Sequence, residues 1–232
     1  MKELISQTKW QFVLLYRNNL ILISIALTSI YALIFYVVKD LGNMDKLLTL
    51  LIYNDPAIIG LFLIGLSIIV EKNQEVLSAI FTTPINHHYY LVSKILSLSI
   101  IGWACGLGMA ISILGFSFNI IHFSAGVFGT CLLFSMAGII LVSYTTDFLL
   151  LILRSIPILL FLSLPLLNYF NITHIQIFYL IPIQGCLNLI IHSYMQSLSL
   201  LEVLYGYASL IFWIPIFYYL AYRIFSSKII NI

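Results

Sequence analysis

The chain has 232 residues, of which 62% are hydrophobic and only 8% are charged. Soluble domains carry about 25% charged residues, so ten Lys and Arg with eight Asp and Glu give too little polar surface for a water-soluble globule. The net charge of +2 is too small for a nucleic-acid-binding surface. The composition therefore excludes soluble enzymes, argues against a nucleic-acid partner and predicts an all-α membrane protein with about six transmembrane helices.

The N-terminal segment, residues 1–18, mixes charged and aromatic side chains. Lys2, Lys9 and Arg17 are interspersed with Trp10 and Tyr16. This mixture is typical of an amphipathic helix that lies in the membrane interface, with its aromatic rings at the depth of the lipid headgroups. We expect this helix to precede the first span and to contact membrane lipids.

Apolar runs between the polar segments predict six spans. They cover residues 20–38, 56–70, 95–116, 125–144, 155–167 and 203–222. Pro56 follows Asp55 and is expected to begin the second span, while the apolar residues 47–53 either extend that span or dip into the bilayer. With these boundaries, the middle of each span lacks Asp, Glu, Lys and Arg, which argues against proton-coupled and ion-coupled transport.

The distribution of Lys and Arg predicts the orientation. Six spans place eight of these residues on one side and only Lys39 and Lys46 on the other. By the positive-inside rule both termini are then cytoplasmic, in a multi-pass protein of a prokaryotic plasma membrane. Residues 71–94 face the cytoplasm and residues 168–200 face outside. Polar residues scattered through 168–200 predict short interfacial or re-entrant helices there.

The sequence predicts no catalytic, cofactor-binding or metal-binding residues. His87 and His88 are adjacent and do not form an HExxH zinc motif. No GxxxxGK[ST] phosphate-binding loop occurs in the chain. We therefore expect a non-enzymatic protein, and any energy for uphill transport must come from another chain.

Residues 71–94 form the most polar stretch in the middle of the chain. Helical spacing over residues 74–83 places four apolar side chains on one stripe, namely Val76, Leu77, Ile80 and Phe81. Pro84 disfavours helix at the residue before it, and Asn86 is expected to cap a second helix that continues into the third span. From these residues alone, the first helix lies parallel to the membrane with its stripe on lipid headgroups.

The spacing within residues 71–94 resembles a motif of ABC-2 type exporter permeases, closest to the drug-export-like branch. The matching residues are Glu71-Lys72, Leu77, Ala79, Ile80, Phe81, Thr83-Pro84 and Leu91 to Lys94. In that family an acidic-basic pair leads into Gly-Thr-Leu-Glu-x-Leu-Leu-x-Thr-Pro, and a later Tyr-Leu-x-x-Lys leads into the third span. This chain departs from the motif at Glu75, Val76 and Ser78, which replace Gly, Thr and Glu.

The resemblance implies a complex of two permease chains, as a homodimer or a paralogous heterodimer, with two ABC ATP-binding subunits that bind ATP and Mg. The residues expected to couple this chain to the ATP-binding subunit are Glu71, Glu75, Leu77, Ile80, Phe81, Thr83 and Pro84. Leu77, Ile80 and Phe81 are expected to be buried in the partner. Glu71 and Glu75 are expected either to pair with basic residues of the partner or to remain solvated. Pro182 and Gly185 are expected in an extracellular gate formed by residues 168–200.

Aromatic content favours a hydrophobic or amphipathic substrate, such as a drug, lipid or peptide, over sugars and ions. The chain contains 16 Phe, 15 Tyr and 3 Trp. A different class of function stays open on the sequence: an integral membrane anchor or scaffold that transports nothing and recruits a cytoplasmic partner through residues 71–94.

Overall fold

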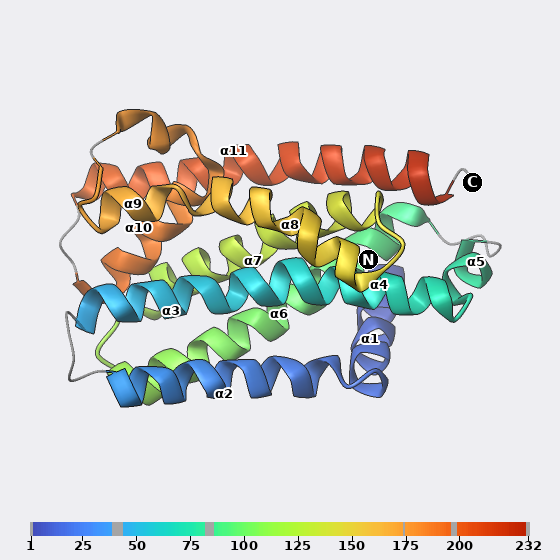
Figure 1. The fold of residues 1–232 in the computed structure, drawn as a ribbon, viewed down its shortest axis with the longest axis horizontal. Coiled ribbons are helices and arrows are strands. Elements are labelled where there is room, and N and C mark those ends of the chain that lie inside the picture. The colour runs from blue at the N-terminus through green and yellow to red at the C-terminus, as the bar shows by residue number, and fades with distance from the viewer. Residues whose placement is uncertain (1, 39–43, 82–85, 174, 196–198, 231–232) are drawn as a thin grey trace.

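The structure, a computed structural model, describes residues 2–38, 44–81, 86–173, 175–195 and 199–230. Within these residues the chain forms helices joined by turns and contains no strand, so the predicted all-α class is confirmed (Figure 1). The helices are α1 (Lys2–Arg17), α2 (Leu20–Val38), α3 (Met44–Ile58), η1 (Ile59–Leu63), α4 (Ile64–Asn73), α5 (Val76–Phe81), α6 (His87–Leu114), α7 (Ile120–Val142), α8 (Phe148–Ser163), α9 (Pro165–Tyr169), η2 (Gln176–Leu180), α10 (Pro182–Met195), α11 (Leu200–Phe225) and η3 (Ser226–Ile230).

Five of the described helical segments are long and apolar enough to cross a membrane. They are Leu20–Val37, Lys46–Asn73, His87–Leu114, Ile120–Val142 and Leu200–Ile229. The predicted fifth span corresponds to α8, which is apolar but has only 16 residues, so the total of six spans stays a prediction. Residues 168–200 contain α10, which packs against α7 and α11.

The second span begins earlier than Pro56, the predicted start. The turns of α3, η1 and α4 follow one another directly, so that the span extends over Lys46–Asn73 and includes Pro56 inside α3. An interruption of the helix at this depth would leave several backbone groups without hydrogen bonds in the bilayer, whereas Pro56 removes only one. As a consequence, Asp55 lies within the span and its side chain is fully buried. The expectation that every span lacks charged residues in its middle is therefore wrong for this helix.

The central helix of the bundle is α7, which packs against α3, η1, α4, α6, α10 and α11. Glycines allow its closest approach to η1. A Cβ atom on Gly138 would lie 2.6 Å from the carbonyl oxygen of Leu61, and one on Gly60 would lie 2.7 Å from that of Cys131. Small residues at helix contacts let membrane helices pack backbone to backbone, so the contact of α7 with η1 depends on these two glycines.

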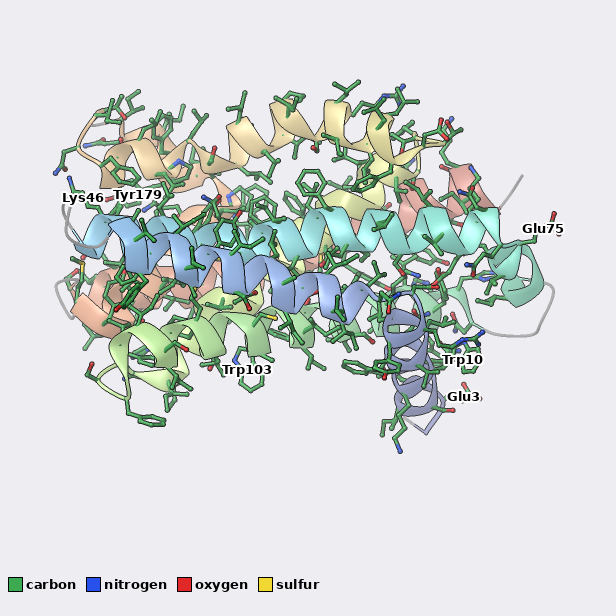
Figure 2. The ribbon with its side chains drawn as sticks, turned by 60° about the horizontal axis from the view of Figure 1, so that its bottom comes forward. Glu3, Trp10, Lys46, Glu75, Trp103 and Tyr179 are labelled. Atoms are coloured by element: carbon green, nitrogen blue, oxygen red, sulfur yellow. The ribbon has the colours of Figure 1, made fainter. Side chains whose placement is uncertain are left out.

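The N-terminal helix α1 runs across the direction of α2 near one end of the bundle (Figures 1 and 2). It packs against α6 and α2, and Trp10 keeps 52% of its surface exposed. This geometry supports the expected interfacial helix, although a position in the interface stays a prediction. Glu75 lies at the same end of the molecule as α1, whereas Lys46 and Tyr179 lie at the opposite end (Figure 2).

Replacement of Gly138 by Ala should destabilise the fold. The new methyl group would meet backbone atoms of η1 that cannot move independently, and overpacking of this kind costs about 1–3 kcal/mol. Gly108→Ala is the matched control, because Gly108 is also helical but a Cβ atom there meets nothing within 4 Å. We expect the control to gain about 0.5–1 kcal/mol from helix propensity. Unfolding of the purified protein in detergent measures the stability of both variants. Equal changes in their free energies of unfolding would contradict this account.

Candidate functional site

The turn between α4 and α5 lies at one end of the bundle, and α5 projects beyond the end of α4 (Figure 1). The last two residues of α4, Lys72 and Asn73, and the two that follow, Gln74 and Glu75, are all exposed, and we refer to these four residues as the turn at 72–75. The chain changes direction at Glu75, whose φ of 57° lies in the left-handed region. This conformation costs a non-glycine residue about 1–2 kcal/mol. It explains why glycine suits the equivalent position of the motif described above.

A buried cluster joins the end of α4 to the start of α6 directly below this turn. Glu71 and Lys94 are each 1% exposed and form an ion pair. The Tyr90 hydroxyl donates a hydrogen bond of 2.5 Å to Glu71 Oε2, and Lys94 Nζ donates one of 3.2 Å to the Tyr90 oxygen. Ser67 Oγ lies 3.5 Å from Glu71 Oε1. Both carboxylate oxygens of Glu71 therefore have partners within the chain.

This cluster fixes the position from which α5 extends. An unpaired charge in such a buried environment costs several kcal/mol, so Glu71 and Lys94 are held at a single relative position of α4 and α6. Tyr90 also stacks on Phe225 at 6.1 Å between ring centroids, which extends the cluster to the end of α11. The cluster therefore connects the ends of α4 and α11 to the start of α6.

Two residues of the apolar stripe of α5, Leu77 and Ile80, face the bundle. Leu77 is 4% exposed and belongs to the main hydrophobic core. Ile80 is half-buried and packs against that core. Together with Trp10, Gln11 and Tyr90, it lines a small cavity of about 60 Å³ between α5, α1 and α6. Leu77 and Ile80 therefore hold α5 onto its own chain.

Several predicted coupling residues are thus placed differently from the expectation. Leu77 and Ile80 were expected to be buried in a partner, but they pack within this chain. Glu71 was expected to pair with a partner or to be solvated, but it is buried and bound to Lys94. Glu75 is exposed. The side chain of Phe81, and all of Thr83 and Pro84, lie outside the described residues. An apolar stripe on a short helix indicates a contact but does not indicate which protein supplies the other surface.

The start of α6 is bound to the end of α11 through His88, which the sequence analysis left without a role. Its ring stacks on that of Tyr222 at 3.6 Å, and its Nδ1 lies 3.0 Å from the hydroxyl of Tyr218. Asn86 caps α6 as predicted, because its side-chain oxygen accepts a hydrogen bond of 2.9 Å from the backbone N–H of His88.

The two predicted gate residues, Pro182 and Gly185, are buried in α10. A Cβ atom on Gly185 would lie 2.6 Å from Cβ of Ser209 and 3.0 Å from the carbonyl oxygen of Gly206, so α10 and α11 are in close backbone contact. Pro182 also borders an apolar cavity of about 390 Å³ with Trp213 and Phe217. The role of these residues in a gate stays a prediction.

These observations define a multi-pass helical membrane protein. Its sequence matches that of the Fluoroquinolones export permease protein family over residues 2–232, and the chain belongs to this family. It is similar to the fluoroquinolones export permease proteins of two Mycobacterium tuberculosis strains, CDC 1551 / Oshkosh and ATCC 25618 / H37Rv. Identity to each is 29% over 157 residues, which cover 66% of this chain and 65% of the relative. No solved structure matches the chain. The predicted resemblance to drug-export permeases is confirmed by the family match.

The buried pair can be tested by removing one charge and then both. Lys94→Met should lower the free energy of unfolding by about 3–5 kcal/mol, because Glu71 would remain buried without its counter-ion. Adding Glu71→Leu should recover most of that loss. Chemical unfolding in detergent measures both variants. Equal losses in the single and double variants would show that the pair is not the determining interaction.

The turn can be tested at Glu75. Glu75→Gly should raise the free energy of unfolding by about 0.5–1 kcal/mol. Glycine adopts the left-handed conformation without the penalty of about 1–2 kcal/mol that other residues carry. The greater backbone entropy of glycine in the unfolded chain offsets about 0.5–1 kcal/mol of this gain. Glu75→Ala is the control, because it removes the same side chain and keeps the strained backbone. A glycine variant no more stable than the alanine variant would contradict the assignment of strain.

Proposed function

We propose that this chain is the membrane-spanning permease subunit of an ATP-driven ABC exporter for drug-like hydrophobic or amphipathic molecules. It pairs with a second permease chain and is energised by two separate ATP-binding subunits. Family membership and the names of the two mycobacterial relatives, which are fluoroquinolones export permease proteins, support this substrate class. The ATP-binding partners follow from the ABC-2 type motif at 71–94.

The exposed turn at 72–75 is the main support for docking at this place. The buried Glu71–Lys94 pair lies directly beside it and fixes it to the bundle. A docking element must present groups to a partner and must also be fixed to the helices that it moves. The turn meets the first requirement with Lys72, Asn73, Gln74 and Glu75, all exposed. The buried cluster meets the second. We therefore assign the primary contact to this turn and give the stripe of α5 a positioning role.

Transmission would proceed through α6 and the second span. Both are long enough to cross the bilayer, at 28 residues each, and the Glu71–Lys94 pair connects them at the end that carries α5. When ATP binding draws the two ATP-binding subunits together, the turn is displaced with them. The ion pair makes the ends of α4 and α6 move as one unit.

Pairing with a second permease chain would use a surface that a single chain leaves uncovered. On α2, Leu22, Leu33 and Tyr36 expose 65%, 64% and 70% of their surfaces. Lipid can cover such a surface, but a translocation pathway between two bundles requires each to contribute one face. By family resemblance, α2 and α8 contribute that face. The membrane-scaffold alternative gains no specific support from the fold.

Photo-crosslinking tests the docking proposal directly. A photoreactive side chain placed at Asn73 or Gln74 should crosslink to the co-expressed ATP-binding subunit. The same group at Ser117, an exposed turn residue between α6 and α7, should not, because it lies at the opposite end of α6. The complex must first show ATP-dependent fluoroquinolone uptake into inverted vesicles. An active complex that never crosslinks from positions 73 and 74 would exclude this docking surface.

A further inference from the structure

Asp55 is a buried carboxylate that the bundle leaves incompletely satisfied. It is 0% exposed on the span Lys46–Asn73. Its Oδ2 atom accepts a hydrogen bond of 2.8 Å from Thr28 Oγ1, and its Oδ1 atom has no hydrogen-bond partner among the described residues. The same Thr28 hydroxyl lies 3.0 Å from the carbonyl oxygen of Ser24. One hydroxyl has a single proton to donate, so these two acceptors share it.

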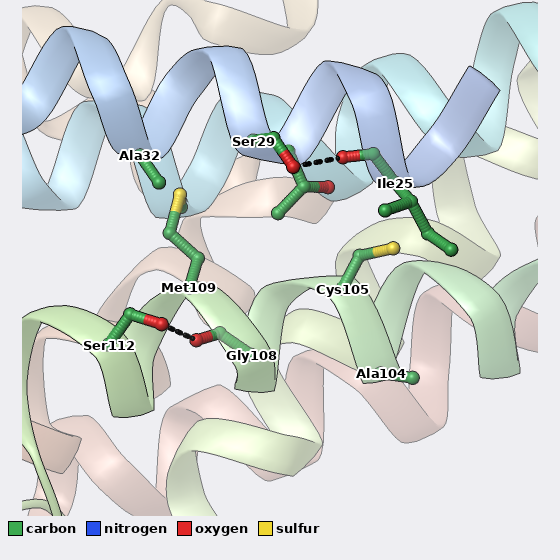
Figure 3. Close-up of a pocket in the computed structure, with 9 residues that line it drawn as sticks. Ile25, Ser29, Ala32, Ala104, Cys105, Gly108, Met109 and Ser112 are labelled. Atoms are coloured by element: carbon green, nitrogen blue, oxygen red, sulfur yellow. Dashed lines mark hydrogen bonds between the residues drawn. The ribbon is translucent and has the colours of Figure 1, made fainter. Parts of the chain in front are cut away.

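A groove lies between α2 and α6 (Figure 3), and Thr28, the hydrogen-bond donor to Asp55, is one of its lining residues. Its volume is about 350 Å³, within the range of about 300–1,000 Å³ typical of small-molecule sites. Small side chains make room for it, including Ala32 on α2 and Ala104 and Gly108 on α6. A Cβ atom on Gly108 would meet nothing within 4 Å, which shows that the wall is open at this point.

Two groove residues connect the groove to Asp55. Thr28 lines the groove and donates the hydrogen bond to Asp55. Cys105 lines the groove from α6, opposite Thr28 on α2. The other two hydroxyls of the wall use their protons within their own helices, since Ser29 donates to the carbonyl of Ile25 and Ser112 to that of Gly108, each at 2.7 Å (Figure 3). They keep only neutral oxygen acceptors for a ligand. The acceptor that can carry a negative charge is Asp55, which the groove reaches through Thr28.

We propose that this groove binds amphipathic organic cations, with a protonated amine of the ligand paired to Asp55 and its apolar part between α2 and α6. The inference rests on the proposed export function and specifies its substrate class. An ionisable group inside a membrane bundle requires a partner, and the unpartnered Oδ1 supplies the missing acceptor for an ammonium N–H. Thr28 forms the entrance. Threonine in a helix has two accessible rotamers, and a rotation of its side chain opens Asp55 to the groove.

Two dansyl probes of equal length test this assignment in the purified permease. One is dansylcadaverine, which ends in a primary ammonium, and the other is the matched dansyl alcohol. Fluorescence titration should give tighter binding of the ammonium probe to the unmodified chain. Asp55→Asn keeps the shape and an acceptor for Thr28 but removes the charge. It should raise the Kd of the ammonium probe at least tenfold and leave that of the alcohol unchanged. Asp147→Asn, at an exposed carboxylate between α7 and α8, is the control and should change neither.

A second variant tests the groove itself. Gly108→Leu places a side chain in open space, so the protein should remain folded while both probes lose binding. Equal affinity of the ammonium probe for the unmodified chain and Asp55→Asn would overturn the proposal. So would retention of binding in Gly108→Leu. These titrations need neither ATP nor a partner. Charge-dependent binding in a chain that supports no ATP-driven efflux would refute the proposed function and leave the cation site intact. ATP-driven efflux without charge-dependent binding would refute the cation site and leave the proposed export function intact.

Discussion

The buried ion pair of Glu71 and Lys94 fixes the ends of the two helices between which α5, the proposed docking helix, is held. It forms where α4 ends and α6 begins, and Tyr90 completes it by bonding to both members. Because an uncompensated charge would be expensive at this position, the relative placement of the two helices is restricted. From this position Leu77 and Ile80 of α5 reach the hydrophobic core.

Much of the architecture is visible in the sequence because the bilayer requires long uncharged helices. The boundaries of α2 and the cap of α6 at Asn86 agree with the prediction. The start of the second span differs from the predicted Pro56, because the bilayer favours continuing the helix through the proline, so that residues 47–53 extend the span, one of the two alternatives that the sequence leaves open. As a result, Asp55, which the prediction places in a loop, lies inside the bundle. An Asp-Pro pair inside an otherwise apolar run is therefore ambiguous without knowledge of its neighbours.

The candidate site was predictable in position but not in detail. The motif at 71–94 located the turn and the short helix, yet no local pattern states that Glu71 pairs with Lys94, a residue 23 positions later. The stripe of α5 was equally ambiguous, because amphipathic spacing specifies an apolar face and not its occupant. Tyr90 and Lys94 stood within the family motif as the tyrosine and lysine that precede the third span. The position of Lys94 directly before the uncharged run of the third span was the available signal for a buried partner.

In the proposed mechanism, the Glu71–Lys94 pair transmits the motion of the ATP-binding subunits to the membrane helices. The most direct measurement is ATP-driven fluoroquinolone transport by the reconstituted complex carrying the exchanged pair, Glu71→Lys with Lys94→Glu. The account predicts that the exchange restores a substantial part of the transport that each single substitution abolishes, because it restores opposite charges at the same contact. A folded, ATPase-bound exchange variant as inactive as the single variants would contradict it.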